Sequence, residues 1–167
     1  RALVDPVLGS SAFAVRGLLF DKTAGANWGV PWHRDLTIAV RERREVPGYG
    51  PWTIKAGVPH VQPPLDVLRN MLTLRLHLDD CGPENGPLRV IPGSQVTAGQ
   101  GQEADRELRE RSRPVDCVVE RAGAVLMRPL LLHASGQAEV AGHRRAVHLE
   151  YAAGPLPGGL ELFESAE

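Results

Sequence analysis

The chain has 167 residues and a nearly balanced charge, with 19 lysine and arginine residues against 20 aspartate and glutamate residues. This length suits one domain with a single core, and the balanced charge argues against a nucleic-acid partner, which requires a large positive field. No apolar run is long enough to span a membrane, and the two cysteines fit neither a zinc site nor a disulfide framework. We therefore expect one domain over residues 1–167, located in the reducing cytoplasm and binding neither nucleic acid nor membrane.

Short runs rich in valine, leucine, isoleucine and phenylalanine recur along the chain, separated by glycine and proline clusters. They occupy residues 12–20, 36–40, 71–78, 88–91, 115–119, 125–127 and 146–151. Such runs, without regularly alternating helices, are typical of antiparallel strands. The pattern predicts a mainly β fold with few short helices, a double-stranded β-helix (a jelly-roll or cupin-like barrel) of two packed sheets.

Two segments interrupt this pattern. Residues 42–64 contain several proline and glycine steps together with Tyr49 and Trp52, which predicts an irregular loop that serves as a lid. Residues 102–111 are strongly charged, with acidic and basic side chains three or four apart, which predicts a short exposed helix. We interpret that helix as a solvated connector.

A candidate metal site begins at His33 and Asp35, which stand two residues apart before an apolar run. In an extended chain such residues point to the same side, so both can bind one ion. His133, at the end of another apolar run, is the candidate third ligand. Two histidines and one carboxylate on one side of an ion leave three positions open, as in Fe(II) oxygenases and unlike closed zinc sites.

Arg144 is the candidate anchor for an anionic ligand in the same cavity, because a short hairpin after His133 can return it there. Its planar guanidinium matches a carboxylate in a bidentate way. Arg145 is the rival, since neighbouring strand residues face opposite ways and only one of the two can point inward. The polarity pattern places Arg145 on the more apolar face of the strand, which favours Arg145 in the interior. The spacing from His133 favours Arg144, and we expect Arg144. Ser135 can add a hydroxyl to the same carboxylate.

One further strand, over residues 71–78, alternates leucines with polar side chains and therefore has a polar face. Thr73 and Arg75 on this face are candidate contacts of a co-substrate or substrate. His77, His143 and His148 are interpreted as ordinary polar residues, because the proposed ligands already suffice.

Three motifs together resemble the phytanoyl-CoA dioxygenase family of Fe(II)/2-oxoglutarate oxygenases, over about residues 15–152. They are W-H-R-D at residues 32–35, L-H-L-D-D-C-G-P-E-N-G-P-L-R-V-I-P-G-S-Q at residues 76–95, and the H-x-S-x(8)-R pattern of His133, Ser135 and Arg144. In the middle motif, Asn85-Gly86 predicts a positive-φ turn between two strands. Gln95 stands where the family usually has histidine, which puts a role of that position in doubt but leaves the metal site intact.

This resemblance implies a chemistry for the site. Fe(II) would be held by His33, Asp35 and His133, which form the catalytic centre, and 2-oxoglutarate by Arg144, with contacts from Ser135, Thr73 and Arg75. With O2, such an enzyme hydroxylates or otherwise oxidises an unactivated C–H bond of a small-molecule substrate and releases succinate and CO2. The retained carboxylate of Asp35 argues against the halogenating relatives.

The resemblance also leaves several questions open. Family members usually carry N-terminal helices that brace one sheet, and we expect that this part is missing from the residues given. We expect a monomer or homodimer, and a CoA ester, a free small molecule or a natural-product intermediate all suit as substrate. The competing interpretation is a metal-dependent cupin-like isomerase or lyase, or a non-catalytic metal-binding barrel, which would not need Arg144.

Overall fold

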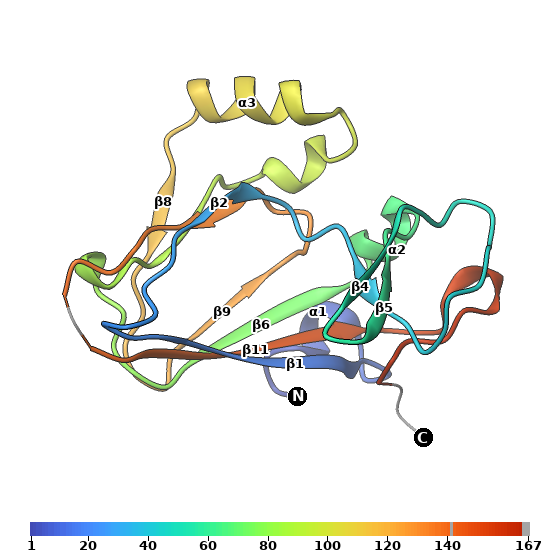
Figure 1. The fold of residues 1–167 in the computed structure, drawn as a ribbon, viewed down its shortest axis with the longest axis horizontal. Coiled ribbons are helices and arrows are strands. Elements are labelled where there is room, and N and C mark those ends of the chain that lie inside the picture. Colours follow the sequence, from blue (N-terminus) through green and yellow to red (C-terminus); the bar gives the residue numbers. More distant parts are fainter. Residues whose placement is uncertain (141, 165–167) are drawn as a thin grey trace.

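A computed structural model describes residues 1–140 and 142–164 and contains two four-stranded antiparallel sheets that face each other (Figure 1). The first sheet consists, in spatial order, of β1 (Phe13–Lys22), β11 (Arg144–Ala152), β6 (Leu72–His77) and β9 (Ala124–Met127). The second consists of β2 (Val30–His33), β10 (His133–Ser135), β7 (Leu88–Val90) and β8 (Val115–Cys117). The predicted double-stranded β-helix is confirmed, and each of the seven predicted runs contains a strand.

A third, smaller sheet lies partly within the segment predicted as an irregular loop. It pairs β3 (Ile38–Ala39), β5 (Val58–Val61) and β4 (Trp52–Lys55). The loop prediction is therefore wrong for residues 52–61, which form a hairpin whose turn residues Ala56 and Gly57 have φ of 49° and 81°. The Ala-Gly turn lacks the Asn-Gly or Asp-Gly signal that identifies such hairpins in a sequence. The role of residues 42–64 as a lid stays a prediction.

The helices are few and short, as predicted. They are α1 (Asp5–Leu8), α2 (Leu65–Arg69) and α3 (Gln102–Arg111), with 3-10 turns η1 (Pro83–Asn85), η2 (Ser94–Thr97) and η3 (Pro157–Gly159). The bounds of α3 coincide with the predicted exposed helix, and Figure 1 shows it beyond η2, on the outer side of the second sheet. Within the described ranges, no helix is long and apolar enough to cross a membrane.

The interior divides into an apolar and a polar part. The largest apolar cluster contains Val15, Ile38, Val40, Tyr49, Val61, Leu68, Met71, Ala98, Leu130, Ala152, Leu156, Leu160 and Leu162. Buried polar side chains come mainly from β1, β6, β10 and β11: Lys22, Thr73, Arg75, His77, His133, Ser135, Arg144 and His148. Burying polar groups without partners costs free energy, so this concentration between the sheets indicates a binding site.

The predicted turn at Asn85-Gly86 is present and packs tightly. Gly86 has φ of 59° at the end of η1, and a Cβ added there would lie 2.8 Å from the Gln137 carbonyl oxygen and closer still to that of Gly136. We expect Gly86→Ala to lower the free energy of unfolding by about 2 kcal/mol or more, because backbone must move to admit the methyl group. Urea denaturation measures this. Gly25→Ala is the control, since nothing lies within 4 Å of its added Cβ, and equal stability of the two variants would contradict the close packing.

Candidate active site

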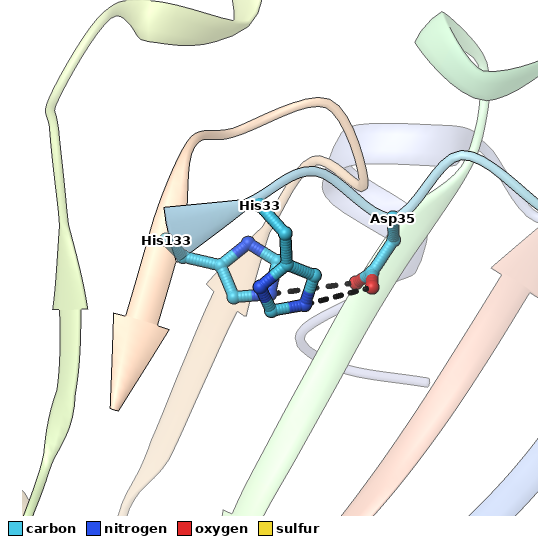
Figure 2. A group of neighbouring side chains, drawn as sticks. All are labelled: His33, Asp35 and His133. Atoms are coloured by element: carbon cyan, nitrogen blue, oxygen red, sulfur yellow. Dashed lines mark ion pairs between the residues drawn. The ribbon is translucent and has the colours of Figure 1, made fainter. Parts of the chain in front are cut away.

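Three potential metal ligands converge between the sheets (Figure 2). His33 is the last residue of β2, His133 is the first of β10, and the antiparallel register pairs them directly. Asp35 follows His33 by two residues, and its backbone N–H donates to the carbonyl of Pro129 at 2.9 Å. The fold thus brings together the three residues predicted as ligands, although β2 and β10 themselves were not among the predicted strands.

Each imidazole is oriented by the backbone carbonyl of the residue two positions before it. Nδ1 of His33 lies 2.8 Å from the carbonyl oxygen of Pro31. Nδ1 of His133 lies 2.8 Å from the carbonyl oxygen of Leu131. Because a carbonyl can only accept a hydrogen bond, Nδ1 carries a proton in each ring, and in a neutral ring Nε2 then has a free lone pair. Metal-binding histidines are commonly fixed in this way.

Both Nε2 atoms face the carboxylate of Asp35. The distance is 3.6 Å from His33 Nε2 to Oδ1 and 3.8 Å from His133 Nε2 to Oδ2. Oδ2 is buried and has no hydrogen-bond partner among the described residues. One ligand atom from each of the three residues lies within 4.8 Å of the other two. This donor set, with an orphaned carboxylate oxygen, fits a divalent cation of the non-haem iron type.

The surrounding charges favour the protonation states that a metal needs. Burial lowers the pKa of His133, which keeps this ring neutral at pH 7. Burial raises the pKa of Asp35. The hydrogen bond with His33 and the charges of His133 and His148 lower it more, so the net pKa of Asp35 lies below its ordinary value. The carboxylate in turn raises the pKa of His33, and a bound cation would displace that proton.

The ligands line a cavity between the two sheets. Its lining residues are Phe20, Trp28, Val30, His33, Asp35, Arg75, Leu88, His133, Ala134, Ser135, Arg144 and His148. Aromatic and aliphatic side chains form part of the wall, and a few polar groups converge on the space, as is usual for small-molecule sites. The potential metal ligands and Arg144 therefore line the same cavity.

Arg144 points into this cavity, where its side chain contacts the Cys81 thiol but, among the described residues, no carboxylate. Its side chain is buried, and Nε and Nη1 have no hydrogen-bond partner in the described part of the chain. Arg145 is exposed and binds the Asp79 carboxylate at 2.7 and 2.9 Å, a hydrogen-bonded pair that lowers the pKa of Asp79 to about 2. A buried guanidinium without a counter-charge is costly, so Arg144 is suited to an anionic ligand.

The other predicted co-substrate contacts differ in position. Ser135 lines the cavity, and so does Arg75, which lies 5.4 Å from the ring centroid of Phe20. Burial and the nearby charge of Arg144 lower the pKa of Arg75 to about 10. Thr73 is fully buried and its hydroxyl has no partner among the described residues, but it does not line the cavity. A direct contact of Thr73 with a ligand therefore has less support.

Sequence reasoning gave no role to two residues that the fold places at this site. His148 lines the cavity, and its buried Nδ1 has no partner in the described ranges. Lys22 is buried, and its Nζ donates to Oγ of Ser135 at 3.3 Å. His148 lies on the same face of β11 as Arg144, so the two-residue alternation of a strand could have identified it. Lys22 could not be identified, because only the register shows that it pairs with Arg144 across β1 and β11.

Arg34, between the two ligands of the W-H-R-D motif, faces the opposite side of the chain. Its Nε lies 3.1 and 3.0 Å from the two carboxylate oxygens of Asp105 in α3. Its Nη1 donates to the backbone carbonyl of Ser94 at 2.7 Å and to that of Leu130. The helix interpreted from sequence as a solvated connector is thus tied to the segment that carries the candidate ligands His33 and Asp35.

Comparison with known families agrees with this geometry. Residues 1–146 match the family model described as phytanoyl-CoA dioxygenase (PhyH). The chain belongs to the phytanoyl-CoA dioxygenase family. Its candidate metal ligands and Arg144 all lie within the matched residues. No curated protein matches the chain.

Solved structures share the phytanoyl-CoA dioxygenase-like fold. AviO1 from Streptomyces viridochromogenes Tue57 is 26% identical with a TM-score of 0.65, covering 93% of this chain and 59% of its own. EctD from S. alaskensis with bound Fe is 20% identical, with a TM-score of 0.65 and coverage of 98% and 52%. HygX from Streptomyces hygroscopicus with nickel and 2-oxoglutarate is 17% identical, with a TM-score of 0.57 and coverage of 90% and 60%. The chain thus spans less than two thirds of each neighbour.

Proposed function

We propose that this member of the phytanoyl-CoA dioxygenase family is an Fe(II)- and 2-oxoglutarate-dependent dioxygenase. It hydroxylates or otherwise oxidises an unactivated C–H bond of a small organic substrate, using O2 and releasing succinate and CO2. The observation that carries the proposal is the convergence of His33, Asp35 and His133 in one cavity with Arg144, which has no carboxylate partner among the described residues. The Fe in the EctD structure and the 2-oxoglutarate in that of HygX support it.

Each group has a defined task in this proposal. His33, Asp35 and His133 would hold the iron, which would supply the oxidising chemistry. Arg144 donates two hydrogen bonds to the distal carboxylate of 2-oxoglutarate, and Ser135 donates a third. The apolar walls of the cavity exclude bulk water, which strengthens these charge-assisted hydrogen bonds.

The alternative is a cupin-like isomerase or lyase, or a non-catalytic metal-binding barrel. It explains the three candidate ligands but not a buried Arg144 that has no counter-charge among the described residues. The small-molecule substrate, the monomeric or homodimeric state and the cytoplasmic location stay predictions, as does the absence of nucleic-acid and membrane partners. No described feature selects among a CoA ester, a free small molecule and a natural-product intermediate.

Anaerobic titration with Fe(II) and 2-oxoglutarate tests the function. The wild-type protein is expected to develop a visible charge-transfer absorption only when both are present. Arg144→Met is expected to weaken 2-oxoglutarate binding about 30-fold or more, because the buried carboxylate loses its counter-charge. Arg145→Met is the matched control, since this exposed neighbour binds Asp79 and should leave the titration unchanged. If the wild type develops no such absorption, the cupin-like alternative gains support.

A further inference from the structure

Arg75 is a buried cation without a hydrogen-bonded or ion-paired acid in the described part of the chain. Its exposed fraction is 7%, and its buried Nε has no partner there. The carboxylate whose charge acts on Arg75 is that of Asp35, which is already a candidate metal ligand. Burial, followed by the like charge of Arg144, lowers the pKa of Arg75 to about 10, so the guanidinium stays charged at neutral pH. Such a buried charge destabilises the empty protein.

The sheet register separates Arg75 from Arg144 within the same cavity. Arg75 pairs with His148 across β6 and β11, whereas Arg144 lies four residues before His148, roughly 13 Å away along the strand. Both arginines line the cavity. The Arg75 guanidinium lies over the Phe20 ring, 5.4 Å from its centroid. Because this contact uses the face of the guanidinium, its N–H groups remain available in the plane for a ligand.

The proposed co-substrate does not balance the positive charge of this cavity. Its distal carboxylate would match Arg144, which already has Lys22 opposite it in the register of β1 and β11. A divalent ion held by one carboxylate, Asp35, keeps one net positive charge, which would match the carboxylate at the 2-oxo end. The charge of Arg75 then has no anion, and O2 cannot supply one because it is neutral. The remaining component of the reaction is the organic substrate.

We propose that Arg75 binds a carboxylate of the organic substrate, so that the enzyme acts on an anionic small molecule, an inference that rests on the proposed function. A single planar guanidinium matches the two oxygens of a carboxylate. Bound there, the carboxylate compensates the buried charge and holds the substrate in the cavity of the candidate metal ligands. Arg75 thereby discriminates against a neutral analogue, which would leave that charge unpaired.

Acetate and acetamide, which have similar shapes and differ in charge, are the probes for this site. Each is titrated into the anaerobic protein loaded with Fe(II) and 2-oxoglutarate, and equilibrium dialysis at constant ionic strength measures the dissociation constants. The charge-transfer absorption verifies that 2-oxoglutarate stays bound. The wild-type protein is expected to bind acetate about 10-fold or more tightly than acetamide, because only acetate compensates the guanidinium.

Variants of Arg75 test whether this residue causes the preference. Arg75→Met is expected to remove it while changing the dissociation constant of 2-oxoglutarate less than about 3-fold, because Arg144 remains. Arg75→Lys keeps the charge without the planar fork and should retain part of the preference. Arg89→Met is the control, since Arg89 is exposed and pairs with Asp116 of β8, and it should leave all three dissociation constants unchanged.

The stability of the protein without metal and co-substrate provides a second measurement. Replacing an uncompensated buried cation by an apolar side chain should raise the midpoint of thermal unfolding, so Arg75→Met is expected to melt at a higher temperature than the wild type. A lower midpoint would show that the chain itself compensates Arg75 and would overturn the inference.

The outcomes separate the two proposals. Wild type that develops no charge-transfer absorption with Fe(II) and 2-oxoglutarate removes the proposed function and this inference with it. Wild type that binds 2-oxoglutarate but binds acetate no better than acetamide overturns only the role of Arg75. A preference that persists in Arg75→Met would place the acetate elsewhere, for example on the metal, and would also overturn it. Equal weakening of 2-oxoglutarate and acetate in Arg75→Met would assign Arg75 to the co-substrate instead.

Discussion

Replacing His133 by alanine is expected to lower the affinity for Fe(II) more than about 100-fold, because changes to groups that merely orient metal ligands already cost 10- to 100-fold. His133 is buried, its Nδ1–H is held by the Leu131 carbonyl, and its Nε2 faces Asp35. Without it, the remaining two ligands cannot hold the ion on three sides. Equilibrium dialysis of the apo-protein with Fe(II) under anaerobic conditions measures the loss.

The matched control for this prediction is His143→Ala. His143 is exposed and pairs only with Asp21 among the described residues, so its removal should leave the affinity for Fe(II) unchanged. Asp35→Asn is a second test that preserves side-chain volume while removing the charge, and thermal melting verifies that each variant is folded. Undiminished metal binding by both His133→Ala and Asp35→Asn would show that the ion binds elsewhere.

Arg34→Met is expected to lower the free energy of unfolding by about 3–5 kcal/mol, because it leaves Asp105 and two buried carbonyls without their donor. The Arg34 side chain is only 4% exposed, against 26% for its Asp105 partner. The same change should weaken Fe(II) binding, since Arg34 fixes the segment that carries both His33 and Asp35. Urea denaturation and metal titration measure the two effects separately.

An exposed arginine of α3 provides the control for Arg34. Arg106 makes ion pairs with Glu103 and Glu110 at the helix surface, and Arg106→Met should change the free energy of unfolding by less than about 1 kcal/mol. The interpretation of Arg34 as a link between α3 and the metal-binding segment fails if both variants are equally stable and bind Fe(II) equally well.

The long strands and the His33/Asp35 pair were predictable because they depend on local patterns in the sequence. Apolar runs over residues 12–20 and 71–78 identified β1 and β6, and the two-residue spacing of His33 and Asp35 placed both side chains on one side of the chain. The strands β2 and β10 were missed because, at 4 and 3 residues, they are too short to show a period. The candidate ligands that these strands carry were still predicted, since residue type carried the signal.

Features that depend on register or on partners far along the chain were not predictable. Lys22 stands opposite Arg144 only because β1 and β11 pair, and no spacing in the sequence indicates that pairing. Asp105 is one of several alternating charges in α3, and nothing local distinguishes it from the solvated ones. The inward position of Arg144 was expected from its distance to His133, whereas polarity alone favoured Arg145. Polarity alone gave the wrong arginine because Arg145, although it lies on the more apolar face of the strand, forms an exposed ion pair with Asp79.

The concentration of positive charge around the cavity also bears on the order of assembly. A divalent cation that entered alone would meet the repulsion of Lys22, Arg75 and Arg144, and among the described residues that line the cavity Asp35 is the one carboxylate that would oppose it. The proposed dianionic co-substrate would offset this repulsion, and it would therefore increase the affinity for the cation. Thermodynamic reciprocity requires that the cation increase the affinity for the co-substrate by the same factor. The electrostatics of the barrel thus favour a protein that is either doubly loaded or empty, with few half-filled molecules.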